Sequence, residues 1–385
     1  MRLGLTSVVA ALLASCTSAQ VPDAGQARTQ TSTAATQSTG APTATAACTN
    51  GAVIRTWSLQ KRAATVVVVP VLDFNVAGAA DELREGAGGL LFLGNAPAPS
   101  NLAARLASVH ALVMADEEGG GIQRLSPLVS NVPWPRQMAA SMTPTQVQAM
   151  ATRIGRQMAA AGVDVDLAPV LDVDARPGPS ATNPDGSRSF SGNATTVAAY
   201  GAAFLRGLRA AGVTPVVKHF PGLGGSVGNT DVTSATTTAQ LGPFRSAIAA
   251  GAPAVMVANA AVNGVTTLPA TLSHAVMTTM LRGQLAFRGL VITDSLSAGA
   301  VQRVVSSLPE AVVRSLIAGA DLTLFGSTLT VSSTQRLAPA VVKRTFTQIV
   351  SAIETAVRTG RLSESRLDSA VGAVLAAEHA NLCQR

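Results

Sequence analysis

The stretch Val216-Val-Lys-His-Phe-Pro-Gly-Leu-Gly-Gly-Ser-Val-Gly-Asn-Thr-Asp231-Val-Thr233 joins an apolar segment to a glycine-rich loop. Its apolar start predicts a buried strand that ends in the pair Lys218-His219. The loop behind this strand carries a single carboxylate, Asp231. Barrel enzymes hold their reactive groups at strand ends and in the loops that follow, so this stretch favours a barrel with its active face here.

Eight short apolar runs follow one another after Cys48, with helical stretches such as Gln146–Ala161 and Thr196–Ala211 between them. Their continuous apolarity is typical of strands buried on both faces of a parallel sheet covered by helices. Eight such units predict one α/β domain, a (β/α)8 TIM-type barrel, over residues 48–385. A doubly wound open sheet is the alternative, because periodicity does not distinguish closed from open sheets. The runs are Thr65–Val71, Leu90–Leu93, Ala111–Ala115, Val165–Val170, Pro215–Val217, Ala254–Ala258, Leu290–Thr293 and Leu322–Phe325.

Many of these runs lead into polar side chains. Because the carboxyl ends of parallel barrel strands share one face, we expect these polar groups to form a ring there. The groups are Asp116, Asp172, Asp174, Lys218, His219, Asn259 and Asp294.

The first 47 residues differ in composition from the rest of the chain. Residues 1–15 hold Arg2 and a short apolar run, which predicts a signal peptide, and Leu13-Ala14-Ser15-Cys16 is similar to a bacterial lipobox. Cys16 is therefore expected to carry lipid, and residues 16–47, rich in Ser, Thr, Ala and Pro, to form a flexible linker. The alternative is an ordinary secretory signal with a chance cysteine. We expect a protein outside the cytoplasm, anchored to the bacterial cell membrane by lipid only.

Two further cysteines, Cys48 and Cys383, flank the predicted domain. In an oxidising compartment outside the cytoplasm they are expected to form a disulfide that joins the two ends of the domain. Two free thiols are the alternative.

Composition excludes several classes of function. The net charge of +7 has no cluster of Lys and Arg with interleaved aromatic residues, which argues against nucleic-acid binding. The four histidines lack metal-ligand spacing, so no metal is expected. The glycine turns lack the lysine and hydroxyl of a phosphate-binding loop, and no Gly-x-Ser-x-Gly elbow precedes a plausible Ser/His/Asp set.

Each candidate residue also has a purely structural interpretation. Asp294 could be a nucleophile or the N-cap of the next helix. Lys218-His219 could bind hydroxyl groups of a polar ligand or form structural ion pairs. Asp116 and Arg124, on either side of a glycine turn, could hold the same ligand or cap that turn.

Together these motifs resemble the family-3 glycoside hydrolases, in particular the single-barrel bacterial β-N-acetylglucosaminidases. The resemblance extends from about Ala63 to the C-terminus. It lies in Gly88-Gly-Leu-Leu-Phe-Leu-Gly, Asp116-Glu-Glu-Gly-Gly, Leu167-Ala-Pro-Val-Leu-Asp-Val-Asp174, Arg188-Ser-Phe, Lys218-His-Phe-Pro-Gly, Leu268-Pro-Ala-Thr-Leu-Ser, Gly289-Leu-Val-Ile-Thr-Asp294 and Ala318-Gly-Ala-Asp321.

The resemblance implies retaining hydrolysis of a terminal β-linked N-acetylglucosamine, on peptidoglycan fragments. We expect a monomer that works without a cofactor. Asp294 matches the family's nucleophile, which forms a covalent glycosyl intermediate. The residues that match those holding the sugar hydroxyls are Asp116, Arg124, Arg188, Lys218 and His219.

This chain departs from the family in the loop after Lys218-His219. The subgroup places an Asp-Ser-His acid/base pair there, whereas this loop reads Asn229-Thr-Asp231-Val-Thr233, with threonine in place of histidine. Asp231 alone is the expected acid/base, with a pKa raised by burial. The alternatives are another acid, Asp174 or Glu117, or a lipid-anchored glycan-binding protein with little turnover. Phosphorolysis instead of hydrolysis is a further alternative within the family.

Overall fold

The computed structural model describes residues 48–180 and 182–384. The predicted signal peptide, the lipid site at Cys16 and the linker lie outside the described residues. Within the described part, Cys48 and Cys383 form a disulfide that closes a sequence separation of 335 residues. No helix in this part is long and apolar enough to cross a membrane.

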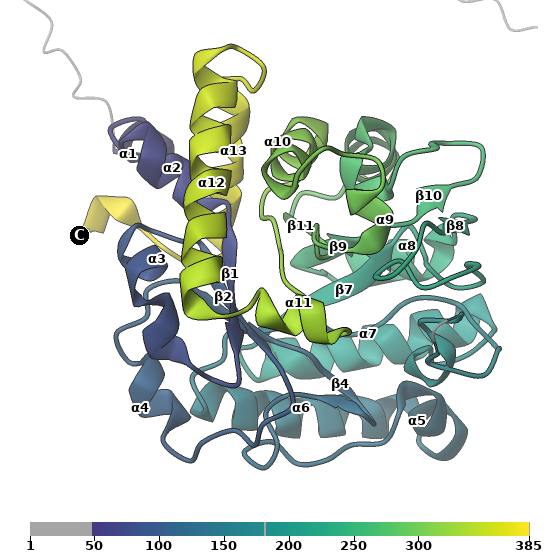
Figure 1. The fold of residues 1–385 in the computed structure, drawn as a ribbon. Helices are drawn as coiled ribbons and strands as arrows, with labels where there is room; N and C mark the ends of the chain where they lie inside the picture. Colours follow the sequence, from purple (N-terminus) through teal and green to yellow (C-terminus); the bar gives the residue numbers. More distant parts are fainter. Residues whose placement is uncertain (1–47, 181, 385) are drawn as a thin grey trace, which may run out of the picture. The chain divides into compact units, whose positions relative to one another are not determined.

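Seven parallel strands form one sheet in the order β1-β2-β3-β6-β7-β9-β11. The segment Leu322-Thr323 bridges the two edges of this sheet, because it pairs with Ile292 of β11 and with Val67 before β1. The sheet thus closes, and the predicted (β/α)8 barrel is confirmed (Figure 1). The strands are β1 (Val68–Leu72), β2 (Gly89–Leu93), β3 (Leu112–Ala115), β6 (Val165–Asp166), β7 (Thr214–Phe220), β9 (Ala254–Val257) and β11 (Leu290–Thr293).

The observed strand bounds equal the sequence-based run only for Leu290–Thr293, and three of the differences bear on the site. The run Val165–Val170 pairs as a strand only over its first two residues, since Pro169 has no N–H for a ladder. The eighth run makes only isolated bridges. In contrast, β7 continues to Phe220, so Lys218-His219 lie inside the strand, at a register shift between Val217 and Phe220. Such irregularities redirect side chains next to active sites.

Helices cover the outside of the barrel, and α6 and α7 form its largest helix pair. Thr143 and Asn193 cap these two helices, and the small residues Gly155 and Gly207 let the helices approach closely. Both α12 and α13 contact α2. The helices are α1 (Asn50–Ile54), α2 (Leu59–Thr65), η1 (Val76–Ala79), α3 (Ala80–Arg84), α4 (Leu102–Leu106), α5 (Pro135–Ser141), α6 (Pro144–Ala160), η2 (Gly186–Arg188), α7 (Ala194–Ala210), α8 (Leu241–Ala249), η3 (Ala270–Leu272), η4 (Ala275–Gln284), α9 (Gly299–Gln302), α10 (Leu308–Ala318), α11 (Val331–Gln335), α12 (Pro339–Arg358), α13 (Glu364–Ala377) and η5 (Leu382–Gln384).

The barrel interior is filled by aliphatic side chains, as the low aromatic content predicts. Val374 of α13 joins the same buried cluster as side chains from the strands, so this helix closes one end of the barrel. The strand side chains in the cluster include Leu91, Met114, Val216, Met256, Ile292 and Leu324. A packed interior leaves the loops at the carboxyl ends of the strands as the place for a site. Two small sheets lie among these loops, the hairpin β4 (Glu117–Gly119) with β5 (Ile122–Gln123), and the pair β8 (Thr236–Thr237) with β10 (Ala261–Val262).

Candidate active site

Lys218 is the centre of a buried ionic cluster. Its Nζ lies 2.6 Å from Oδ1 of Asp116 and 2.6 Å from Oε1 of Glu118. Asp116 and Glu118 are two residues apart where the chain enters the β4–β5 hairpin, so they can point to the same side. Burial favours a neutral Lys218, but the two carboxylates outweigh burial and raise the pKa of its ammonium group.

Arg188 completes this ionic cluster from the other side. Its Nε and Nη2 donate to the two oxygens of Glu118, both at 2.8 Å, which is the bidentate geometry that arginine forms with carboxylates. Burial alone would raise the pKa of Glu118, but the charges of Arg188 and Lys218 hold it well below its usual range. Glu118 is therefore an anion that fixes two cations at the barrel mouth.

His219, the next residue of β7, is held by Asp172. Its Nδ1 lies 2.6 Å from Oδ2 of Asp172, and its Nε2 lies 3.4 Å from Nη2 of Arg188. Burial and the nearby charge of Arg188 lower the pKa of His219 to about 4, so the imidazole is neutral at neutral pH. The structure thus offers a polar ring nitrogen next to a fixed guanidinium.

Asp294 follows β11 directly and is half-buried. Its Oδ1 accepts the backbone N–H of Ser295 at 2.7 Å. Burial raises the pKa of Asp294 to about 6, with His219 lowering it and Asp231 raising it in turn. The next helix, α9, begins only at Gly299 with Ala298 as its N-cap, so the capping interpretation of Asp294 is wrong.

Asp231 lies on the loop after β7 and faces the same cluster. Burial raises the pKa of its carboxyl group, the charge of Arg188 opposes this, and Asp116 adds to it. Its backbone carbonyl accepts the N–H of Gly299, and the carbonyl of Thr230 accepts that of Ala300. The loop is thus held against the start of α9, and Thr233 donates its backbone N–H to the carbonyl of Asn229 in the same turn.

Arg124 lies apart from these contacts. Its Nη1 donates to the carbonyl of Gly94 and to Oδ1 of Asn95, in the loop after β2, and its backbone N–H donates to the carbonyl of Asp116. The structure therefore brings together six of the seven predicted residues and connects Arg124 only through the hairpin backbone.

Three residues of the site have no assigned role in the sequence analysis: Glu118, Asp172 and Asp185. Glu118 and Asp172 stand in the quoted motifs, and the two-residue spacing from Asp116 is a signal for Glu118. Asp185 is fully buried just before η2, beside Asp172 and His219. No local pattern separates it from a surface loop acid.

The two alternative acids are already engaged elsewhere. Asp174 is paired with Arg176 at 2.7 Å, and this pairing lowers its pKa against the effect of burial. Glu117 accepts the backbone N–H of Leu125 and the side-chain amide of Gln123. Both groups therefore stabilise loops, which leaves Asp231 as the free carboxyl partner of Asp294.

Asp172, Asp185 and His219 are the one group among the described residues with metal-binding side chains close together. The separation of 2.6 Å between Nδ1 of His219 and Oδ2 of Asp172 is that of a hydrogen bond. Backbone N–H groups of Leu223 and His219 also donate to Asp172, and Arg188 lies beside the group. The arrangement is that of a hydrogen-bonded network.

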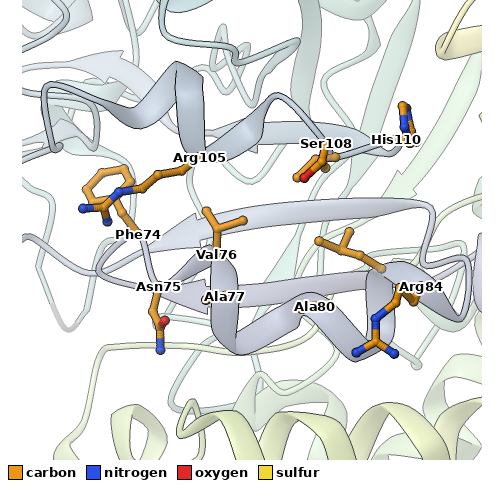
Figure 2. Close-up of a pocket in the computed structure, with 11 residues that line it drawn as sticks. Phe74, Asn75, Val76, Ala77, Ala80, Arg84, Arg105, Ser108 and His110 are labelled. Carbon is orange, nitrogen blue, oxygen red and sulfur yellow. The ribbon is translucent and has the colours of Figure 1, made fainter.

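A separate cavity of about 720 Å³ lies among η1, α3 and the segment that follows α4. Figure 2 shows Asn75, Arg84, Arg105 and His110 around it. Its lining residues include no carboxylate and none of the predicted site residues. This cavity therefore lacks the paired carboxyl groups on which the chemistry of the barrel mouth depends.

The sequence pattern of the glycosyl hydrolase family 3 N-terminal domain matches residues 99–377. The chain belongs to this family. The predicted resemblance is thereby confirmed, and the matched region contains each of the carboxylates described above.

Individual relatives carry related names. The chain is 37% identical over 273 residues to beta-hexosaminidase LpqI of Mycobacterium tuberculosis, a match that covers 67% of this chain and 66% of that protein. The match thus spans slightly less than two thirds of the relative's length.

Solved structures extend the match to most of the described barrel. A family-3 glycosyl hydrolase from Mycobacterium smegmatis is 31% identical, with a TM-score of 0.72 over 86% of this chain and 98% of that one. A beta-N-acetylhexosaminidase from Beutenbergia cavernae is 30% identical, with a TM-score of 0.73 over 84% of this chain and 99% of that one.

Proposed function

We propose that the protein is a retaining β-N-acetylhexosaminidase that removes terminal N-acetylglucosamine from peptidoglycan fragments. The observation that carries this proposal is the pair of half-buried carboxyl groups, Asp294 directly after β11 and Asp231 on the loop after β7, where the charge of Asp231 raises the pKa of Asp294. Retaining glycosidases need two such groups, one to attack and one to transfer the proton. The relatives named beta-hexosaminidase support the choice of sugar.

Asp294 is the proposed nucleophile. With a pKa of about 6 it is mostly ionised at neutral pH, and the nearby positive charge of Lys218 favours that ionised form. Its carboxylate oxygen attacks the anomeric carbon as the bond to the leaving oxygen breaks, which gives a covalent glycosyl ester. Water then attacks the same carbon, and the retained configuration results from the two inversions.

Asp231 is the proposed acid/base. Its raised pKa favours the protonated form, which can donate to the leaving oxygen in the first step and accept a proton from water in the second. Lys218, Asp116, Arg188 and His219 surround the pair with donors and acceptors suited to sugar hydroxyls. Arg124 belongs to the proposed binding set through its place on the hairpin.

The location outside the cytoplasm, with a lipid anchor at Cys16, is part of the same proposal. The Cys48–Cys383 disulfide supports it, since such bonds form and persist in oxidising compartments. A monomer with one site per chain is sufficient for the proposed chemistry, because the described residues alone supply both carboxyl groups.

The test is release of nitrophenol from an aryl β-N-acetylglucosaminide. An aryl leaving group needs little protonation, so turnover is expected even if proton transfer by Asp231 is weak. Asp294→Asn is the control and should be inactive. Wild-type turnover no higher than this control would favour the glycan-binding alternative. Formation of sugar 1-phosphate in the presence of phosphate would show phosphorolysis instead.

A further inference from the structure

Asp185 is fully buried, and neither of its carboxylate oxygens meets a hydrogen-bond donor among the described side chains and backbone groups. One oxygen lies with an atom of Asp172 and an atom of His219 in a group within 4.8 Å of one another. An ionised carboxylate without donors is strongly unfavourable in such a site. The carboxyl group of Asp185 therefore needs either a proton or a cation.

Asp172 is the acceptor that a proton on Asp185 would meet. Its Oδ1 accepts the backbone N–H of Leu223 at 2.6 Å and that of His219 at 3.2 Å, while Oδ2 faces Nδ1 of His219 at 2.6 Å. Three donors favour the ionised form of Asp172. Two adjacent buried carboxyl groups share one proton more readily than they both ionise, so the proton belongs on Asp185.

The charges around the pair agree with this placement. Burial raises the pKa of Asp185 well above its usual range, the charge of Asp172 raises it further, and Arg188 and His219 oppose the rise. His219 in turn faces Arg188, Asp294, Lys218 and Asp185. A neutral imidazole avoids a third positive charge beside Arg188 and Lys218.

We propose that Asp185 is a positioning residue for His219: it keeps its proton and donates it to Asp172. Asp172, as the carboxylate, accepts Nδ1–H of His219, which leaves the lone pair on Nε2. That lone pair faces Nη2 of Arg188 at 3.4 Å, and at the barrel mouth a hydroxyl of the sugar can replace this long contact as the hydrogen-bond donor. The contact with a sugar hydroxyl rests on the proposed function, whereas the Nδ1–H tautomer of His219 does not.

The direct test is nitrogen NMR of the histidine rings in the full-length protein labelled with ¹⁵N. Only four histidines contribute, and His219→Gln identifies the signals of His219. Burial raises the pKa of Asp172 to about 6, so the test is made above that value, where we expect a neutral ring with its proton on Nδ1, unchanged between about pH 7 and 8. An Nε2–H tautomer, a charged ring in this range, or a spectrum altered by EDTA would each overturn the proposal. This measurement needs no substrate, so its outcome does not depend on the proposed glycosidase activity.

Two substitutions of Asp185 test whether its role is to donate a hydrogen bond: one keeps a neutral donor and the other removes it. Asp185→Asn is neutral and still donates to Asp172, so we expect kcat/KM on the aryl glycoside within about threefold of wild type and an unchanged His219 spectrum. Asp185→Ala removes the donor and should lower kcat/KM by about 10- to 100-fold, mainly through KM, with a changed spectrum. Asp164→Asn, at an exposed acid outside the site, is the control and should change neither. Equal losses in Asp185→Asn and Asp185→Ala would refute the proposal.

Discussion

Two parts of the same barrel face are held in different ways. The ionic cluster of Asp116, Glu118, Arg188 and Lys218 is fixed by buried contacts between charged side chains. The loop at Asp231 is held to α9 by two backbone hydrogen bonds, and its side chains Val227 and Val232 are 78% and 53% exposed. The cluster is therefore preorganised, while the proposed proton donor, Asp231, lies on the part that can change without disturbing the cluster.

Asp231→Asn, on the loop, is expected to have the largest effect on activity. The variant keeps the shape of the side chain but cannot transfer the proton, so we expect kcat on an N-acetylglucosaminyl disaccharide to fall by about 10²- to 10⁴-fold. The loss on an aryl glycoside in the glycosylation step should be much smaller. Steady-state kinetics on both substrates measure this, with circular dichroism to confirm folding. A similar loss on both substrates would show that Asp231 is not the acid.

Glu118→Gln tests how far the ionic cluster contributes to stability and activity. The change leaves Arg188 without its anionic partner, while Lys218 keeps Asp116, so we expect unfolding to become easier by about 3 kcal/mol, as for a broken buried ion pair. The shifted cations should also lower kcat/KM on both substrates by up to about 100-fold. Denaturant unfolding and kinetics measure the two effects.

Glu117→Gln, the adjacent acid on the same hairpin, is the matched control for Glu118→Gln. Burial raises the pKa of Glu117 to about 7, so it is already partly neutral at neutral pH and should tolerate the amide. If both variants lose the same activity, the two-cation role of Glu118 is not supported.

The pH dependence of kcat/KM tests the ionisation of Asp294, the proposed nucleophile. Asp294 must be ionised to attack, and its pKa is about 6, so the rate should decrease as pH falls through 6 and be about tenfold lower at pH 5 than on the plateau. Initial rates on the aryl glycoside between pH 4.5 and 8 measure this limb, with fluorescence to confirm that the protein stays folded. A flat profile between pH 5 and 7 would contradict the assignment.

Gly299→Ala tests whether the loop at Asp231 can move without affecting the ionic cluster, and its expected effect is the smallest. A Cβ at this position would lie 2.6 Å from the carbonyl oxygen of Val232 and 3.1 Å from that of Asp231, so the loop must shift. We expect kcat on the disaccharide to fall by about tenfold and the aryl rate to change little, because only the proton donor moves. Gly242→Ala, at a helical position with nothing within 4 Å of the added carbon, is the control. Equal losses on both substrates would mean that the cluster depends on this loop.

The barrel could be predicted because each strand carries its own signal, a continuous apolar run. The eighth run, Leu322–Phe325, shows the limit of this signal. It is as apolar as the other runs, but it pairs with its two neighbours only through isolated bridges. Asp294 and Lys218 could be found by position alone, because strand ends converge on one face. Pairing within that face was not predictable: Glu118 contacts Arg188 across 70 residues, and Asp172 contacts His219 across 47. Such contacts depend on loop geometry that no local pattern encodes.

The helix that closes the barrel has a consequence for how the protein is made. Val374 of α13 enters the interior cluster, and a Cβ on Gly88, just before β2, would lie 3.3 Å from it. This side chain is synthesised after all eight strands, so the strands emerge from the ribosome while one end of their core is still open to water. Until residues 364–377 have been synthesised, the chain lacks the helix that covers this end of the core, so the barrel can be completed only near the end of translation.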